Sequence, residues 1–168
     1  IELGKHFKCP IISCDSRQFY AELNIGVAKP TIKELNEVKH YFIGHKSIEN
    51  LYSAGEFELD VLDFLNEYYK KNNIAIMTGG SGMYIDAVCH GLDKIPRDEN
   101  LRKELNNQFL KKGLKSIQQE LKQLDPIHFQ NVDIQNPQRI IRSLEVCLLT
   151  NKPYSSFLNR KKKNRPFN

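Results

Sequence analysis

Two short polar segments stand directly after apolar runs that are typical of buried strands. Residues 15–18 (DSRQ) follow residues 10–14 (PIISC), and residues 79–82 (GGSG) follow residues 74–78 (IAIMT). In open α/β sheets ligands bind at the carboxyl ends of the strands, where both segments would lie. A carboxylate there can accept a proton, and glycines let the backbone approach an anion closely. Either segment alone also suits a turn or a helix cap, but together they favour a ligand site.

A second polar group lies on one predicted helix. Gln138, Arg139 and Arg142 are spaced i, i+3 and i, i+4, which places them on one face, opposite an apolar stripe that ends at Leu148. Such a face can hold RNA phosphates or a base edge. The alternative is an ordinary surface face with an ion pair between Arg142 and Glu145, and the residues alone favour this alternative.

The elements that must position the strand-end residues indicate an α/β fold. Both apolar runs are unbroken rather than alternating, which is typical of a parallel sheet with helices on both faces. Between them, Ser53 and Glu56 form a capping box, and apolar residues then follow at four-residue steps until the polar segment 70–73. Residues 10–14 and 74–77 are therefore predicted to be parallel strands of one sheet.

After Pro96 the strand pattern disappears and three helices are predicted. The first begins after Asp98 and ends at Gly113, the second covers residues 114–124, and the third covers residues 137–150. An α/β part is thus followed by a helical part.

Composition narrows the class of protein. A length of 168 residues suits about one domain, and no apolar run approaches the ~18 residues needed to span a bilayer. The four cysteines form no C-x-x-C pair and the five histidines have no metal-ligand spacing, so we predict no metal site and a reducing, cytoplasmic location. The net charge of +5 comes from one run that is expected to be solvated, formed by Arg160, Lys161, Lys162, Lys163 and Arg165.

Five segments resemble, in order and spacing, the signature segments of tRNA dimethylallyltransferases. They are residues 14–20 (CDSRQFY), 25–30 (IGVAKP), 52–57 (YSAGEF), 79–84 (GGSGMY) and 136–146 (NPQRIIRSLEV). Adenylate isopentenyltransferases share the early segments, but the last segment is more similar to the tRNA enzymes. The resemblance covers most of the chain.

The resemblance implies a P-loop fold that transfers a dimethylallyl group from dimethylallyl diphosphate, held with Mg²⁺, to N6 of adenosine 37 in tRNA. Asp15 would be the general base. Ser81 would supply a hydroxyl where the family usually has threonine, and Gly79, Gly80 and Gly82 would complete the substrate loop. The resemblance also implies contacts with the tRNA anticodon stem-loop for Asp15, Ser16, Arg17, Gln18, Arg102, Gln138, Arg139, Ile140, Ile141 and Arg142.

By the same resemblance, residues 1–95 are an incomplete P-loop-type core, and residues 96–168 are a helical tRNA-binding insertion with the start of the return to the core. The phosphate-loop pattern G-x-x-x-x-G-K-[ST] is absent. We therefore expect this piece to lack the Mg²⁺ ligands, to lack a strand in the middle of its sheet and to be inactive by itself. The full-length protein is expected to be a monomer. Val27 stands where the family usually has threonine.

Three other functions stay open on the sequence. They are prenylation of free adenine nucleotides, phosphoryl transfer by a P-loop small-molecule kinase, and noncatalytic RNA binding. A kinase would share the strand-end aspartate but would not need the arginine-bearing helix at 136–146.

Overall fold

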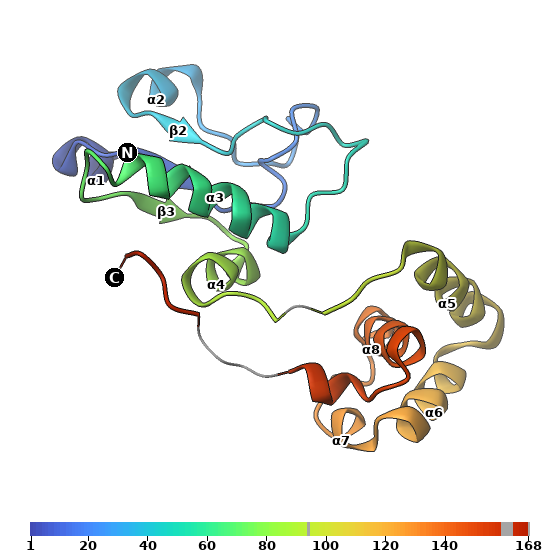
Figure 1. The fold of residues 1–168 in the computed structure, drawn as a ribbon. Helices are drawn as coiled ribbons and strands as arrows, with labels where there is room; N and C mark the ends of the chain where they lie inside the picture. The colour runs from blue at the N-terminus through green and yellow to red at the C-terminus, as the bar shows by residue number, and fades with distance from the viewer. Residues whose placement is uncertain (94, 159–162, 168) are drawn as a thin grey trace. The chain divides into compact units, whose positions relative to one another are not determined.

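The computed structural model describes residues 1–93, 95–158 and 163–167. The chain forms two compact units (Figure 1): Ile1–Leu92 with Lys162–Asn168 make up the first, and Asp93–Lys161 make up the second. Among the described residues, no helix has the length and apolar composition needed to cross a membrane.

The first unit is built on a three-stranded parallel sheet, as its two apolar runs predict. The strands are β1 (Ile11–Ser13), β2 (His40–Tyr41) and β3 (Ile76–Thr78), in the order β2-β1-β3. β2 was not predicted, because two half-buried residues leave no periodic pattern. β1 and β3 pair directly, with Ser13 opposite Thr78, so the strand expected to be missing from the middle of the sheet does not lie between them.

Helices flank this sheet and share its core with residues of β1 and the loops. They are α1 (Glu2–Phe7), α2 (Ile32–Glu37), α3 (Ala54–Tyr68) and α4 (Gly82–His90). The predicted capping box of α3 is present, with the Ser53 hydroxyl accepting from Glu56 N–H. Phe57, Val61 and Leu65 of α3 are buried at the predicted four-residue steps. α3 also packs against α4, so both helices lie close to the carboxyl end of β3 (Figure 1).

The second unit is a bundle of helices (Figure 1). It contains α5 (Glu99–Lys112), α6 (Leu114–Leu124), α7 (Pro126–Phe129), α8 (Pro137–Thr150) and the 3₁₀ helix η1 (Tyr154–Phe157). The predicted caps are confirmed, since Asp98 accepts from the first amides of α5 and Asn136 from those of α8. α7 and η1 were not predicted. The fully buried Asp125 joins them by accepting from His128 N–H at 2.9 Å and from Ser155 N–H at 2.7 Å.

α8 is the central helix of this bundle, and its burial differs from the predicted single stripe. It contacts α5, α6 and η1, so it is buried on more than one side. Ile140 and Ile141 are both fully buried although they are neighbours in sequence. Leu148, predicted to belong to the core face, is instead 37% exposed. A one-sided amphipathic pattern does not describe a helix that is packed on several sides.

Candidate active site and RNA-contact face

The two predicted site segments meet where β1 and β3 end. Cys14 N–H donates to Thr78 O at 2.7 Å, and Ser81 N–H donates to Cys14 O at 3.1 Å. These bonds extend the pairing of the strands into the segments that follow them. The sheet therefore brings Asp15 and Ser81 together, as their positions after parallel strands predict.

Gly79 allows this close approach. A Cβ on Gly79 would lie 2.2 Å from both the carbonyl carbon and the oxygen of Cys14, which no side chain can satisfy. A Cβ on Gly80 would lie 3.8 Å from Oδ2 of Asp15, so the carboxylate lies over this part of the glycine loop. The absence of a side chain at Gly79 thus allows two backbones to meet, one of which carries Asp15.

The two carboxylate oxygens of Asp15 differ in their surroundings. Oδ1 accepts from Arg17 N–H at 2.9 Å, which closes an Asx turn. Oδ2 accepts no hydrogen bond from any residue in the described part of the chain. One oxygen shapes the turn and the other remains able to accept a proton.

The Ser81 hydroxyl connects the two segments. It accepts from Ser16 N–H at 3.0 Å and donates to Ser16 Oγ at 3.1 Å. Ser81 is also the N-cap residue of α4, but its side chain accepts from none of the amides of that helix. The hydroxyl therefore holds the turn that carries Asp15.

Gln18 has an internal role that the sequence did not reveal. Its side chain accepts from Ser13 Oγ at 2.8 Å and donates to Ala28 O at 2.6 Å, joining β1 to the segment 25–30. Lys29 fixes the same segment by donating to Tyr20 O at 2.7 Å and to Ala21 O at 3.2 Å. An open cleft of about 430 Å³ lies here, lined in part by Gln18, Ala28, Lys29 and Gly79.

A buried layer of aromatic rings packs beneath the turn at 15–18. Phe19 is fully buried and stacks on Phe57 with ring centroids 5.0 Å apart. It also contacts Tyr84, whose hydroxyl donates to Tyr52 O at 3.0 Å. Arg17 remains exposed at the surface. The turn therefore has a buried anchor next to the residues proposed to meet a substrate.

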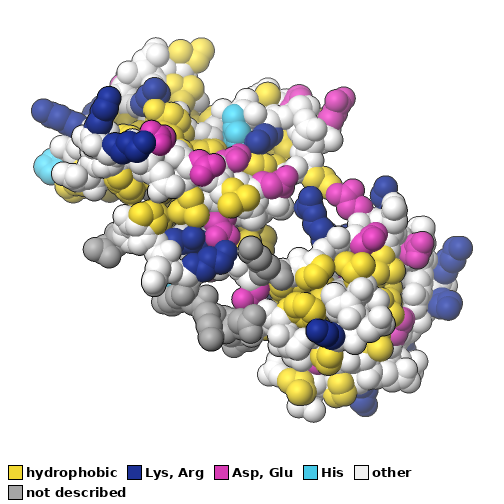
Figure 2. Space-filling model, in the orientation of Figure 1, with side chains coloured by type: hydrophobic (Ala, Val, Ile, Leu, Met, Phe, Trp, Pro, Cys, Tyr) yellow, Lys and Arg dark blue, Asp and Glu magenta, His cyan; other side chains and the backbone are white. Residues whose placement is uncertain are grey.

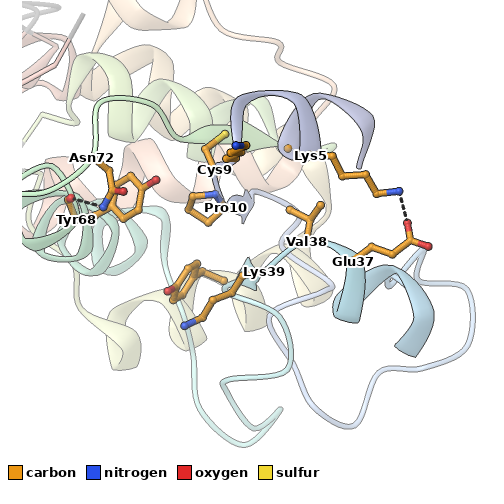
Figure 3. A pocket seen from close by; sticks show the side chains of 11 residues that line it. Lys5, Cys9, Pro10, Glu37, Val38, Lys39, Tyr68 and Asn72 are labelled. Atoms are coloured by element: carbon orange, nitrogen blue, oxygen red, sulfur yellow. Dashed lines mark hydrogen bonds and ion pairs between the residues drawn. The ribbon is translucent and has the colours of Figure 1, made fainter.

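A larger cleft of about 500 Å³ lies near the opposite end of the strands (Figure 3). Its lining includes Lys5, Pro10, Lys39 and Tyr68, and Lys5 Nζ lies 2.7 Å from Oε2 of Glu37. None of the predicted site residues lines it. Size alone therefore does not identify the candidate active site.

The predicted RNA-contact residues of the second unit form a polar surface across α5 and α8. Gln138 Nε2 donates to Asn106 Oδ1 at 3.3 Å, and Asn106 Nδ2 donates to Arg102 O at 2.8 Å. Arg139 is exposed, and its guanidinium has no ion-pair partner among the described residues. We call this surface the α5–α8 strip, formed by Arg102, Asn106, Gln138, Arg139 and Arg142.

Arg142 is only partly available on this strip. It donates to Pro96 O at 2.9 Å and to Ile95 O at 3.2 Å, and its Nη1 lies 2.9 Å from Oε2 of Glu145. The ion pair considered from the sequence is therefore present. The carboxylate of this ion pair is not on the surface, however, because Glu145 is fully buried.

Two residues predicted by resemblance do not reach the strip. Ile140 and Ile141 pack in the core of the second unit with Leu105, Ile117 and Leu144. Their side chains therefore hold α8 in place within the bundle.

The sequence analysis did not identify Asn106 as a member of the strip or Glu145 as the residue beneath it. Glu145 accepts from Asp98 N–H at 2.7 Å and from Nε and Nη2 of Arg102 at 3.0 and 2.6 Å. Burial alone would raise the pKa of the Glu145 carboxyl, but the bonds from Asp98, Arg102 and Arg142 outweigh burial and lower that pKa. Glu145 therefore remains an anion beneath the strip.

The basic run at 160–165 is only partly described, since Arg160, Lys161 and Lys162 lie outside the described residues. Its expected solvation is wrong for Arg165, whose side chain is 8% exposed. Arg165 Nη2 donates to Oε1 of Glu58 at 2.8 Å, and Lys163 Nζ donates to the same oxygen at 3.0 Å. On the face drawn in Figure 2, Lys and Arg side chains are scattered among acidic and hydrophobic ones. The net charge therefore does not by itself define an RNA surface.

Comparisons with known proteins agree on one family. The family model described as IPP transferase matches residues 18–168. A tRNA dimethylallyltransferase of Flavobacterium johnsoniae is 47% identical over 99% of this chain and 56% of its own length. The tRNA dimethylallyltransferase 1 of Bacteroides fragilis is 44% identical over the same shares. The chain thus spans about half the length of the curated relatives it matches.

Solved structures agree with this result. The tRNA isopentenylpyrophosphate transferase of Bacillus halodurans matches 91% of this chain and 51% of its own, with a TM-score of 0.53 and 31% identity. A eukaryotic dimethylallyltransferase acting on tRNA matches 99% of this chain and 42% of its own, with a TM-score of 0.75. At 20% identity the second match supports the fold alone. The extensive sequence matches show that this chain belongs to the IPP transferase family.

Proposed function

We propose that the full-length protein transfers a dimethylallyl group from dimethylallyl diphosphate to N6 of adenosine 37 in a tRNA anticodon loop. Membership of the IPP transferase family supports this activity. One observation assigns this activity to particular residues. Where β1 and β3 end, Asp15 lies over the glycine loop, and its Oδ2 is able to accept a proton.

The proposed step is a displacement at the allylic carbon. The N6 lone pair of adenine forms the new N–C bond, the C–O bond to diphosphate breaks, and diphosphate leaves with that electron pair. The N6 proton passes to Oδ2 of Asp15. An exocyclic amine loses its proton readily once the N–C bond forms, so an ionised carboxylate is an adequate base.

Ser81 and Gln18 support this step by fixing the backbone. Ser81 holds the turn that carries Asp15, and Gln18 holds the segment 25–30 beside it. The family resemblance implies Mg²⁺, but no cluster of three or more His, Cys, Asp or Glu residues in the described part of the chain could hold it. No step is therefore assigned to the metal.

We further propose that the second unit contacts the anticodon stem-loop through the α5–α8 strip. Arg102, Arg139 and Arg142 supply positive charge, and Asn106 and Gln138 supply amide groups that can hydrogen-bond to RNA. We also propose a cytoplasmic location, because the four cysteines are free thiols, as is usual in a reducing compartment.

The direct test is an acceptor comparison with the full-length protein. Isotope-labelled dimethylallyl diphosphate is offered with an anticodon stem-loop, with the same stem-loop carrying guanosine at position 37, or with free adenine nucleotides. We expect label only in the first RNA, at N6 of adenosine. Transfer to free nucleotides would indicate the adenylate enzyme instead, and binding of RNA without transfer would indicate a noncatalytic module.

Replacing Arg139 by alanine should weaken binding of the stem-loop and reduce the dependence of log K on log salt by about one unit per lost phosphate contact. Thermal stability should not change, because Arg139 is exposed and has no ion-pair partner among the described residues. Binding constants at several salt concentrations measure the effect.

Arg142→Ala is the comparison. It should weaken RNA binding and also lower the melting temperature, because Glu145 loses an ion-pair partner. An equal loss of affinity for dimethylallyl diphosphate in Arg139→Ala would contradict a specific RNA role.

A further inference from the structure

Glu145 is a fully buried carboxylate shared by two arginines of the α5–α8 strip. Its Oε2 lies 2.6 Å from Nη2 of Arg102 and 2.9 Å from Nη1 of Arg142. Its Oε1 accepts a hydrogen bond from the backbone N–H of Asp98, and Asp98 is the N-cap residue of α5. One side chain of α8 thus fixes the start of α5 and two guanidinium groups together.

Stability alone does not explain this arrangement. A buried ion pair loses hydration that its Coulomb attraction barely repays, and apolar replacements are often as stable. The pairing does, however, hold two long side chains that would otherwise sample many rotamers. It also offsets the repulsion between two guanidinium groups that share one acceptor.

Both arginines still reach the surface from this anchor. The side chain of Arg102 is 43% exposed and that of Arg142 is 27% exposed, while Glu145 beneath them is fully buried. The bonds of Asn106 to Arg102 and Gln138 continue the strip from this pair. Two adjacent guanidinium groups with spare donors match the several oxygen acceptors of one phosphodiester.

We propose that Glu145 is a positioning residue for RNA, holding Arg102 and Arg142 as a preformed pair for one backbone phosphate. The inference rests on the proposed function, because it assumes that the strip meets tRNA. Arg139, outside this ion-paired group, would contact RNA without the help of Glu145.

The sign of one substitution tests the proposal in the full-length protein. Glu145→Gln keeps the shape of the side chain but removes a negative charge from beneath the strip. Charge alone predicts tighter RNA binding, because the surface becomes more positive. Positioning predicts the opposite, a loss of roughly ten-fold in affinity for the anticodon stem-loop as the arginine pair loses its anchor.

Glu104→Gln is the matched control. Glu104 is exposed on α5, two residues from Arg102, and undergoes the same chemical change. It should bind the stem-loop as tightly as the unaltered protein or slightly tighter. If Glu145→Gln behaves like Glu104→Gln, the positioning role is overturned. If the unaltered protein itself neither binds nor prenylates the stem-loop, the proposed function fails instead.

A second comparison separates positioning from a general loss of folding. In an Arg102→Gln background, Glu145→Gln should cost less RNA affinity than it does alone, because one of the two arginines is already gone. Affinity for dimethylallyl diphosphate should stay constant. An unchanged cost in that background, or an equal loss for both substrates, would assign Glu145 to stability alone.

If the Glu145→Gln protein does not fold, Arg102→Lys provides an alternative test. Lysine keeps the charge beside Glu145 but loses the two-pronged contact of the guanidinium. Weaker stem-loop binding at unchanged net charge is expected. Binding as tight as in the unaltered protein would contradict the preformed pair.

Discussion

Replacing Asp15 by asparagine in the full-length protein is expected to lower the rate of prenyl transfer by roughly 10²- to 10⁴-fold. Asparagine can keep the bond from Arg17 N–H through Oδ1, so the Asx turn should survive. It replaces Oδ2 by an amide nitrogen, which cannot accept the N6 proton. Single-turnover prenylation of an anticodon stem-loop measures the step directly, and RNA affinity should change little.

Asp86→Asn is the matched control for this experiment. Asp86 lies on α4 of the same unit and is largely exposed, so the same chemical change there should leave the rate unaltered. If Asp15 serves only as a turn residue, asparagine would keep the rate within a few-fold. Near-normal turnover by a stable Asp15→Asn protein would remove this carboxylate from the mechanism.

The sequence was sufficient for features that depend on neighbouring residues. The boundaries of α3, α5 and α8 follow from caps at Ser53, Asp98 and Asn136, and the periodic burial between them follows from helix geometry. The meeting of Asp15 and Ser81 could also be predicted, because parallel strands bring their carboxyl ends to one edge.

Contacts between residues far apart in the chain could not be predicted in this way. Arg102 and Glu145 are 43 positions apart, and Glu58 and Arg165 are 107 positions apart. Spacing rules for helices reach only three or four residues, so they identified Arg142 beside Glu145 and missed Arg102. The second arginine is what makes this group a shared anchor.

The same limit explains the internal partners that the sequence analysis missed. Gln18 is predicted from the resemblance to contact tRNA, and the fold adds an internal role, because both ends of its amide bond to other parts of the first unit. Arg165 looked like part of a solvated basic run, yet it is buried against Glu58. From the sequence alone, a polar residue is expected to face solvent. In the folded chain it can instead be buried and hydrogen-bonded to a residue that is distant in sequence.

Gly79→Ala is expected to have the second large effect, on both stability and rate. The added Cβ would lie 2.2 Å from the Cys14 carbonyl, and no rotamer can relieve a clash between a Cβ and a backbone. The loop after β3 must therefore move away from the turn that carries Asp15. Such overpacking typically costs about 1–3 kcal/mol, and displacing a catalytic group by ~1 Å can lower a rate by roughly 10²-fold.

Gly82→Ala provides the contrast within the same loop. Among the described residues, no atom beyond the chain neighbours and the helix backbone of Gly82 lies within 4 Å of a Cβ placed there. Gly82 is the first residue of α4, where alanine favours the helix over glycine by up to about 1 kcal/mol. This variant should be as stable as the unaltered protein or more so. Thermal unfolding and single-turnover rates are measured for both, at a temperature where both are folded. The hydrogen bonds that join Ser81 to Cys14 and Ser16 depend on the close approach of the two backbones. A Gly79→Ala protein with unaltered rate and stability would therefore show that the backbones do not approach as closely as the Asp15 mechanism requires.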